Sequence, residues 1–334
     1  MRILFVCNYK PGVGGISGQV EALQRHLREE NHIADVFSTK GSIIKRLSMS
    51  YKLKRIVRDY DVIHIHCCSK WGFLPAILGI IATRRSNKRT VLTYHGGGGD
   101  TFFSKHKNLI RYVLTRTDVN IVLSAFLGKV FDKYNLPYII IPNIIELDES
   151  HYRVRESIRP DYICTRSHEK IYNIPCILRA FQQVQRNRSD ATLTLVGDGS
   201  LHDELISLTV KMRLENVVFT GRVDNSIIYK YLDNAVFMLS SPTVDNMPVS
   251  LLEAMNSGLL VISSEVGGVP YMIENGKNGY LFKNGDDEGL ANIMLRVLNS
   301  RDDFIRITEN ARKSLREYSW SSVKDSILSV YSNA

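Results

Sequence analysis

The sequence has few cysteines, and they form neither a disulfide framework nor a redox motif. The five cysteines stand at positions 7, 67, 68, 164 and 176, with no Cys-x-x-Cys pair among them. An odd number of cysteines in mostly apolar surroundings is typical of reduced, structural thiols. This excludes a disulfide-stapled secreted scaffold, and we expect a cytoplasmic protein.

Long apolar runs are also absent. The longest one, residues 71–82, contains one proline and two glycines, and it is too short to span a bilayer. The apolar start MRILFVCNYKPG has no small-residue cleavage site, so it predicts a first strand that enters a Gly-rich turn rather than a signal peptide. With 44% hydrophobic and 23% charged residues, the composition is that of a soluble globular protein.

Acidic residues are scarce in the first half of the chain. Residues 1–150 hold 22 Lys and Arg against 12 Asp and Glu, a net charge of +10, whereas residues 151–334 hold 21 against 22, a net charge of −1. Residues 40–58 carry seven basic side chains and no acidic one. A basic amphipathic helix there could lie on an anionic membrane surface at the inner face of the cell membrane, or be a solvated helix packed on its own sheet. Nucleic acid is not an expected partner, because no recognised binding module accompanies the charge.

Apolar segments of strand length alternate with helical patterns along the whole chain. This alternation predicts an α/β fold with parallel sheets covered by helices, and 334 residues favour two domains. The charged segment 146–160 is the candidate linker. We expect strands near residues 2–7, 33–37, 61–66, 90–94, 119–123, 138–141, 161–165, 191–196, 216–220, 235–239, 259–263 and 280–282.

The stretch from residue 240 to residue 268 carries the sharpest local signal. Pro248 near the first helical position and Gly258 just past the last one mark both ends of a helix that follows a strand. The free N–H groups of Val249 and Ser250 at such a helix start suit a phosphate or diphosphate. Asp245 and Glu253, eight residues apart, could accept hydrogen bonds from sugar or ribose hydroxyls. The pattern therefore predicts a sugar-nucleotide pocket, with an ordinary solvated helix start as the alternative.

The segment LLEAMNSG in this stretch resembles the donor site of the retaining glycosyltransferases of family 4. That family has two Glu eight residues apart, and Glu253 falls on the second of them, while Asp245 replaces the first. The resemblance implies a GT-B fold, with two Rossmann-like domains facing each other across a cleft. It also implies a nucleotide-sugar donor, a UDP-, GDP- or other nucleoside-diphospho-sugar, and transfer with retention that needs no metal ion.

The resemblance divides the chain into three parts. Residues 1–150 would form the domain that binds a saccharide or lipid-linked acceptor, and residues 151–315 the domain that binds the donor. Residues 316–334 would form a last helix that crosses back to the first domain, as the family's last helix does.

Glycine turns follow several predicted strands. Gly14 and Gly15 come after the first strand, where they let the backbone turn tightly and approach a ligand; a plain strand-to-helix turn is the alternative. The family has a similar Gly-Gly close to the donor phosphate. Gly197 and the run Gly221–Val223, which includes Arg222, end later strands, and the resemblance implies that this run lies beside the nucleobase.

Three cationic or titratable residues complete the expected site. His95 ends a strand ahead of four glycines, and the family carries a His near the transferred sugar in this loop. Arg166 ends the first strand of the second domain, where its guanidinium could neutralise the leaving diphosphate. The family's Lys-Gly pair is replaced by Tyr172 and Asn173, and Lys170 stands two residues early.

Two histidines on one strand, His64 and His66, point to the same face. They could ligate a metal, but no third ligand is evident, so no metal site is expected. The resemblance implies a hexosyltransferase-type glycosyltransferase in cell-surface polysaccharide or glycolipid biosynthesis. Two alternatives stay open, a sugar-nucleotide epimerase of the same fold and a non-catalytic subunit that binds nucleotide sugars or carbohydrate.

Overall fold

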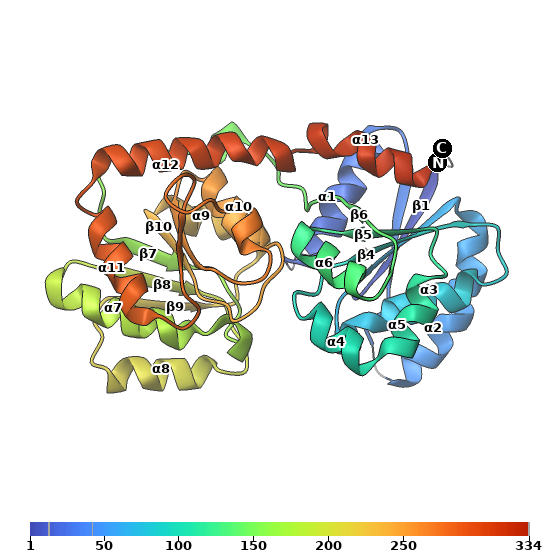
Figure 1. Ribbon diagram of the computed structural model, residues 1–334, viewed down its shortest axis with the longest axis horizontal. Coiled ribbons are helices and arrows are strands. Elements are labelled where there is room, and N and C mark those ends of the chain that lie inside the picture. Colours follow the sequence, from blue (N-terminus) through green and yellow to red (C-terminus); the bar gives the residue numbers. More distant parts are fainter. Residues whose placement is uncertain (13, 42, 333–334) are drawn as a thin grey trace. The chain divides into compact units, whose positions relative to one another are not determined.

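The structure is a computed structural model that describes residues 1–12, 14–41 and 43–332, without the side chains of residues 43–48. The chain divides into two compact units (Figure 1). Unit 1 comprises Met1–Glu146 and the residues from Tyr318 onward, and unit 2 comprises Leu147–Glu317. The chain therefore passes from one unit to the other twice.

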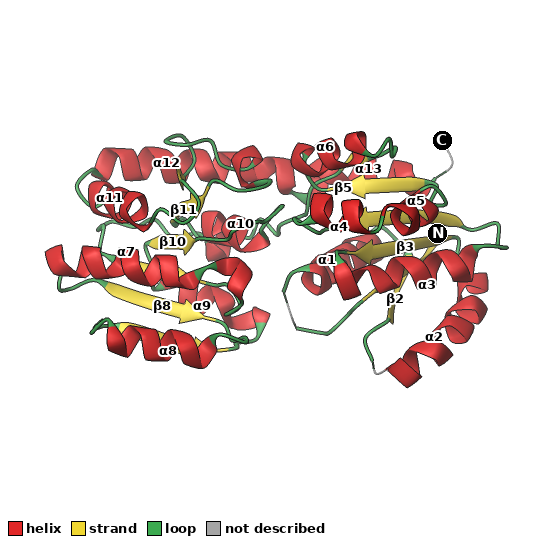
Figure 2. Ribbon diagram, turned by 60° about the horizontal axis from the view of Figure 1, so that its bottom comes forward, coloured by secondary structure: helices red, strands yellow, loops and turns green. Residues whose placement is uncertain are grey.

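The described part of unit 1 is built on one parallel sheet, with strand order β2-β1-β3-β4-β5-β6. Helices cover both of its faces (Figure 2). The strands are β1 (Arg2–Cys7), β2 (Ile33–Ser38), β3 (Val62–Cys67), β4 (Arg89–Tyr94), β5 (Val119–Val122) and β6 (Ile139–Ile140). The helices are α1 (Ile16–Glu29), α2 (Ile43–Ile56), α3 (Leu74–Thr83), α4 (Gly99–Lys105), α5 (Lys107–Leu114), α6 (Ala125–Lys133) and α13 (Trp320–Tyr331).

Alternate residues of the central strands feed two separate cores in unit 1. Ile3 and Phe5 of β1 pack on the side of α1 and α13, whereas Leu4 and Val6 pack on the side of α2 to α6. Because both faces of the sheet are covered, its inner strands carry mostly apolar residues on both faces, which is why they are recognisable as largely apolar segments.

Unit 2 repeats the architecture with a different strand order, β12-β11-β10-β7-β8-β9, again all parallel. This is the doubly wound Rossmann order, and its topological switch point lies between β7 and β10, where ligands bind in such sheets. The strands are β7 (Asp161–Cys164), β8 (Thr192–Val196), β9 (Val217–Gly221), β10 (Phe237–Ser240), β11 (Leu260–Ser264) and β12 (Tyr280–Phe282). The helices are α7 (Ile174–Asn187), α8 (His202–Lys211), α9 (Ile228–Asp233), α10 (Val249–Asn256), α11 (Asp287–Val297) and α12 (Arg301–Ser314).

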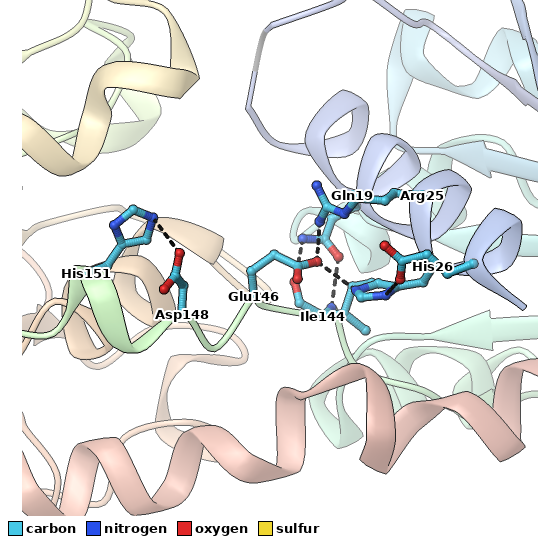
Figure 3. Close-up of polar contacts among 8 residues, drawn as sticks. Gln19, Arg25, His26, Ile144, Glu146, Asp148 and His151 are labelled. Atoms are coloured by element: carbon cyan, nitrogen blue, oxygen red, sulfur yellow. Dashed lines mark hydrogen bonds and ion pairs between the residues drawn. The ribbon is translucent and has the colours of Figure 1, made fainter.

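The segment that leads out of unit 1 is held by α1 (Figure 3). The side-chain amide of Gln19 donates to the carbonyl of Ile144 and accepts from its N–H, both at 2.9 Å. The Glu146 carboxylate bonds Nε2 of His26 at 2.7 Å and also pairs with Arg25. These bonds to α1 therefore hold the backbone in place where the chain leaves unit 1 for the first time. In unit 2, Asp148 accepts from the N–H of Ser150 at 2.8 Å and caps the short turn that follows.

Two consecutive helices lie at the end of the described chain. The helix α12 ends at Ser314, a 3-10 turn (Leu315–Tyr318) follows, and α13 starts after the cap Ser319, whose hydroxyl accepts from the N–H of Ser322 at 3.3 Å. Val323 and Ile327 of α13 are buried in the core of unit 1. The predicted α/β fold with two doubly wound sheets is confirmed.

Candidate functional site

The helix α10 starts at the carboxyl end of β10 without a side-chain cap. Pro248 occupies the cap position in an extended conformation, and it makes no side-chain hydrogen bond to the helix. Among the described residues, no hydrogen bond is made to the N–H groups of Val249 or Ser250 outside the helix. Both groups therefore remain available to an anion, and the positive end of the helix dipole adds to their attraction.

The loop before α10 is fixed by two glycines that follow β11. Gly267 has φ +56°, and a Cβ atom there would collide with the carbonyl oxygen of Asp245. A Cβ atom at Gly268 would likewise meet the carbonyl oxygen of Asn246, and the N–H of Gly268 donates to Asp245 O at 3.0 Å. Because only glycine permits this approach, the pair holds the backbone that carries Asp245.

Arg166 follows β7 and reaches across the switch point to this loop and helix. Its Nη2 pairs with the Asp245 carboxylate, and its Nη1 donates to Ser250 Oγ at 2.9 Å. Its Nε is buried with no hydrogen-bond partner among the described residues. Burial would lower the pKa of Arg166, but the Asp245 carboxylate together with Tyr172 and Cys164 outweighs burial, and the pKa is raised. The side chains are only 11% and 18% exposed for Arg166 and Asp245, so the site contains a nearly buried ion pair.

Glu253 lies on α10, one turn after Ser250. Burial raises its pKa to about 7, and the Arg166 charge opposes this only in part. Desolvation disfavours the charged form of a carboxyl that lacks a close cationic partner. Near neutral pH the Glu253 carboxyl is therefore divided between its protonated and ionised forms, and it can both donate and accept hydrogen bonds.

Tyr172 and Asn173 stand where the family has Lys-Gly, and Tyr172 contacts Arg166. Tyr172 stacks on Arg166, with the guanidinium carbon 4.1 Å from the ring centroid. Asn173 has φ +44°, a left-handed conformation that glycine adopts most easily and asparagine tolerates. Lys170 begins a 3-10 turn (Lys170–Tyr172) and is exposed, with no ion pair among the described residues. Tyr172 thus helps to hold the guanidinium.

The remaining glycines expected in the donor site lie at the ends of β8 and β9. Gly197 and Gly221 are neighbours, and the N–H of Gly197 donates to the carbonyl of Gly221 at 3.0 Å. A Cβ atom at Gly197 would collide with the carbonyl oxygen of Arg166, so the ends of β7, β8 and β9 converge. Arg222 is exposed and Val223 is partly buried beside them.

In unit 1 the glycine loop after β1 is tied to α1. Gly15 caps α1 with φ +70°, and Gly14 before it is exposed. The carboxylate of Glu21 accepts from the N–H of Gly12 at 3.2 Å and from the hydroxyl of Tyr9 at 2.9 Å. Glu21 therefore holds the loop against its helix.

His95 follows β4 at the same sheet edge, next to buried histidines of β3. Its Nε2 is 2.9 Å from Nδ1 of His66. His64 bonds the hydroxyl of Tyr331 at 2.7 Å and that of Thr93 at 2.8 Å. Burial lowers the pKa of His64 and of His95 to about 3, and it lowers that of His66 as well. All three imidazoles are therefore neutral near pH 7.

The predicted basic helix is partly defined. Lys45 and Arg46 lie outside the residues whose side chains are described. Further along α2, Leu53 is buried in the core of unit 1, while Lys52, Lys54 and Arg55 are exposed. In the described part of the chain, no helix is long and apolar enough to cross a bilayer, and no group of three or more His, Cys, Asp or Glu is placed to hold a metal ion.

The structure thus brings Arg166, Asp245, Ser250 and Glu253 together in unit 2, and Gly197 and Gly221 beside the backbone of Arg166. Three roles were not visible in the sequence: the stacking of Tyr172, the hydroxyl of Ser250 as a partner of Arg166, and the pairing of His66 with His95. The replacement of the family's Lys-Gly pair was the sequence feature that could have pointed to a role for Tyr172. The His-x-His pattern of β3 was the feature that could have pointed to His66.

Comparisons with known proteins identify the family of the chain. The family model described as "Glycosyl transferases group 1" matches residues 159–314, and the one described as "Glycosyltransferase Family 4" matches residues 24–149. The chain is 26% identical over 293 residues to the N-acetyl-alpha-D-glucosaminyl L-malate synthase of Bacillus anthracis, which covers 81% of this chain and 74% of that protein.

Two solved structures share the fold. HepE of Anabaena, crystallised with UDP and glucose, superposes with a TM-score of 0.79 at 17% identity over 100% of both chains. S. aureus TarM, crystallised with fondaparinux, alpha-GlcNAc-glycerol and UDP, superposes with a TM-score of 0.75 at 19% identity; 86% of this chain is covered, but only 59% of TarM. With a family 4 domain in its first half and a group 1 domain in its second, the chain belongs to the family 4-like group 1 glycosyltransferases of GT-B fold.

Proposed function

We propose that the protein transfers a sugar from a nucleoside-diphospho-sugar to a saccharide or lipid-linked acceptor, with retention of anomeric configuration and without a metal ion. The observation that carries this proposal is the Arg166 guanidinium at the switch point of unit 2, beside the uncapped start of α10. The relatives support the class of reaction, since one is by name an N-acetyl-alpha-D-glucosaminyl L-malate synthase and two structures of similar fold hold UDP.

The leaving diphosphate gains negative charge as the bond to the sugar breaks. The N–H groups of Val249 and Ser250 and the Arg166 guanidinium would hold that charge, and they lower the barrier where they bind the transition state more tightly than the ground state. These groups supply the charge neutralisation that a divalent cation supplies in other transferases, which is why we propose a metal-free reaction. Lys170 and Arg222 would add cationic charge from exposed positions.

Without donor, the Asp245 carboxylate neutralises Arg166. An arriving diphosphate would compete for the guanidinium, and the unpartnered Nε gives it a further donor. Asp245 would then accept hydrogen bonds from hydroxyls of the transferred sugar. Glu253 would bind the ribose hydroxyls, which need acceptors rather than a charge, and this suits a carboxyl whose pKa is raised to about 7.

The remaining groups have supporting roles. Gly197, Gly221 and Val223 would admit the nucleobase, and Gly14 and Gly15 would let the backbone approach the diphosphate. His95, neutral by its lowered pKa, would hydrogen-bond the transferred sugar. With no general base identified, the departing phosphate oxygen would itself take the proton of the acceptor hydroxyl.

The acceptor domain would be unit 1, whose sequence carries the basic excess. An acceptor with anionic groups, such as a lipid-linked precursor of a cell-surface glycan, suits this charge, and the exposed cations of α2 would hold the protein at an anionic membrane surface of the cytoplasmic face. The name of one relative, the alpha-monoglucosyldiacylglycerol synthase of Streptococcus pneumoniae, supports a glycolipid product.

A thermal-shift panel of nucleotide sugars tests the proposal first. A ligand that binds only the folded state raises the melting temperature, so we expect a shift with at least one UDP- or GDP-sugar. Glu253→Ala should then weaken nucleotide binding about tenfold by calorimetry, while Glu288→Ala, a matched exposed Glu on α11, should leave it unchanged.

Product analysis tests the chemistry. We expect the product to keep the anomeric configuration of the donor by NMR, and activity to survive a chelator. Inversion, or activity that needs added Mn²⁺, would contradict the mechanism. Binding of nucleotide without transfer or hydrolysis would identify a non-catalytic subunit instead, and conversion of the donor alone would identify an epimerase.

A further inference from the structure

His66 and His95 form a direct imidazole pair in unit 1. His66 lies on β3, and His95 follows β4 directly. The register pairs Cys67 with Tyr94, and the N–H of His95 donates to the carbonyl of Cys67 at 2.8 Å. Nδ1 of His66 and Nε2 of His95 are 2.9 Å apart, and the rings are stacked with centroids 5.2 Å apart at 27°. Backbone and side-chain bonds therefore fix the two rings together.

Both rings are neutral, because burial lowers the pKa of each well below neutral pH. A neutral imidazole carries one N–H donor and one bare nitrogen acceptor. In a bond between two neutral imidazoles, one ring must donate and the other must accept. The direction of this one bond therefore fixes which nitrogen carries the proton in both rings.

The other nitrogen of His66 decides the direction. His66 is 2% exposed, and its Nε2 is buried with no hydrogen-bond partner among the described residues. If His95 donated to Nδ1 of His66, Nε2 of His66 would carry a buried N–H without an acceptor. Orphaned buried N–H groups are rarer in proteins than under-satisfied acceptors. The favoured direction is donation from Nδ1 of His66, which leaves Nε2 as a bare acceptor.

The surroundings of the pair give Nε2 few alternatives. A cavity of about 20 Å³, lined by His64, His66 and His95, is completed mainly by aliphatic side chains. Gln19, one of its polar lining residues, has both amide atoms bonded to the backbone of Ile144. A bound water needs two to four polar partners to be held, and this lining supplies few that are not already engaged.

We propose that His66 is a positioning residue that locks His95 in the tautomer with the proton on Nδ1. His95 then presents an N–H donor at Nδ1, and its Nε2 is already used. A ring held in this way can donate a hydrogen bond to an oxygen of a neutral ligand, but it cannot act as a general base through Nδ1. This role rests on the function proposed above, in which the ligand is the transferred sugar, and it assigns the His95 contact to a sugar hydroxyl or ring oxygen.

The tautomer can be measured without any substrate. In ligand-free protein labelled with ¹⁵N-histidine, long-range ¹H–¹⁵N correlation spectra distinguish the two tautomers, and His95→Gln identifies the His95 signals by their loss. We expect a protonated Nδ1 and a bare Nε2 for His95, with the same protonation for His66. A protonated Nε2 on His95, or an equal mixture of tautomers, would overturn the proposal.

Variants separate the positioning role from a merely structural one. His66→Asn places an amide donor near the position of Nδ1, so it should keep the Nδ1–H tautomer of His95, whereas His66→Leu should release a mixture of tautomers. Tyr331→Phe is the matched control, since it removes a buried bond to His64 at 2.7 Å and should leave the His95 tautomer unchanged. If Tyr331→Phe and His66→Leu altered the tautomer equally, the lock would not reside in His66.

Turnover gives a second readout, with UDP-glucose hydrolysis as the probe. His66→Leu should lower kcat about tenfold with little change in KM, and His66→Asn should recover most of the loss. Equal losses in both variants would mean that the hydrogen-bond donor is not what matters. Because the spectra are recorded without ligand, a failure of the glycosyltransferase assignment would leave the tautomer result intact, so the two failures are distinguishable.

Discussion

The carboxyl-end edges of the two sheets bury polar groups in opposite ways. At the edge of unit 1, His64, His66 and His95 are kept neutral and bonded to each other or to hydroxyls. At the edge of unit 2, Arg166 and Asp245 form an ion pair. The same architecture thus offers neutral hydrogen-bond donors and acceptors in unit 1 and a nearly buried ion pair in unit 2.

This difference matches two kinds of ligand. A buried cation is costly unless an anion compensates it, so the pair in unit 2 suits a site where a diphosphate replaces the carboxylate. Neutral imidazoles carry no such cost, and they suit the uncharged hydroxyls of a sugar. The charge outside the edges differs too, since the basic excess of the sequence lies in residues 1–150 and not in residues 151–334.

Removal of the cation of unit 2 should have the largest effect on activity. Arg166→Ala should lower turnover by roughly 10²–10³-fold, as the loss of a preorganised donor to a developing anion does, and donor affinity by less. Arg166→Lys should recover part of the turnover, because it keeps the charge but not the two-pronged geometry. Steady-state kinetics and calorimetry check both. A loss of donor affinity with turnover unchanged would show that Arg166 binds the ground state and the transition state equally.

Acid should weaken the edge of unit 1. A buried His with a pKa lowered to about 3 stays neutral when folded, whereas the unfolded chain takes up a proton near pH 6.5. The contribution of each neutral imidazole to the free energy of unfolding is therefore complete above pH 7 and is lost as pH falls. The loss between pH 7.5 and 5.5 is about 1.4 kcal/mol for each such His. For His64 and His66 together it is roughly 3 kcal/mol.

Hydrogen exchange of β3, corrected for the intrinsic effect of pH, measures this loss. His64→Gln should remove about half of it. In unit 2, the pKa of His168 is also lowered by burial, so peptides around it should lose protection too, but from one imidazole rather than several. Protection of β3 that does not change between pH 7.5 and 5.5 would contradict neutral burial of these rings.

Replacement of the exposed cations of α2 tests the difference in surface charge between unit 1 and unit 2. Replacing Lys52, Lys54 and Arg55 by Gln should weaken binding to phosphatidylserine-containing liposomes about tenfold or more, since each nearby basic side chain contributes about 1 kcal/mol. The matched control replaces exposed lysines of unit 2, Lys211, Lys230 and Lys283. Co-sedimentation measures the binding. If both triple variants changed it equally, or neither did, α2 of unit 1 would not be a membrane-binding surface.

Glu253 should give the smallest effect and one of opposite sign to that of the histidines. Its pKa is raised to about 7 from an unfolded value near 4.5, so its contribution to stability is present below pH 4.5 and is lost as pH rises through 7. Because the side chain is partly exposed, we expect Glu253→Gln to be more stable than the natural chain at pH 8 by only about 1 kcal/mol, and equal at pH 5. Thermal melts at the two pH values check this, and a variant less stable at pH 8 would contradict the raised pKa.

Much of the fold could be predicted from the sequence because both sheets are covered on both faces. Their inner strands are mostly apolar on both faces, so the expected segments 61–66 and 235–239 correspond closely to β3 and β10. The start of α10 was visible for a local reason, Pro248 at one end and Gly258 at the other. In the segment 316–334, where a last helix was expected, the structure has α13, which a 3-10 turn separates from α12.

The contacts within the site could not be predicted in the same way. Arg166 and Asp245 are 79 residues apart and meet only because β7 and β10 are neighbours in the sheet. The predicted roles of Arg166 and Asp245 treated them as separate, and their pairing depends on side-chain direction rather than on sequence spacing. His66 and His95 likewise meet through the pairing of β3 with β4.

The most direct test of the account is a crystal structure of the protein with UDP. We expect the diphosphate within hydrogen-bond distance of the N–H groups of Val249 and Ser250, the Arg166 guanidinium turned from Asp245 toward it, and the ribose on Glu253. UDP bound elsewhere, or a diphosphate at α10 that leaves the pair of Arg166 and Asp245 undisturbed, would contradict it.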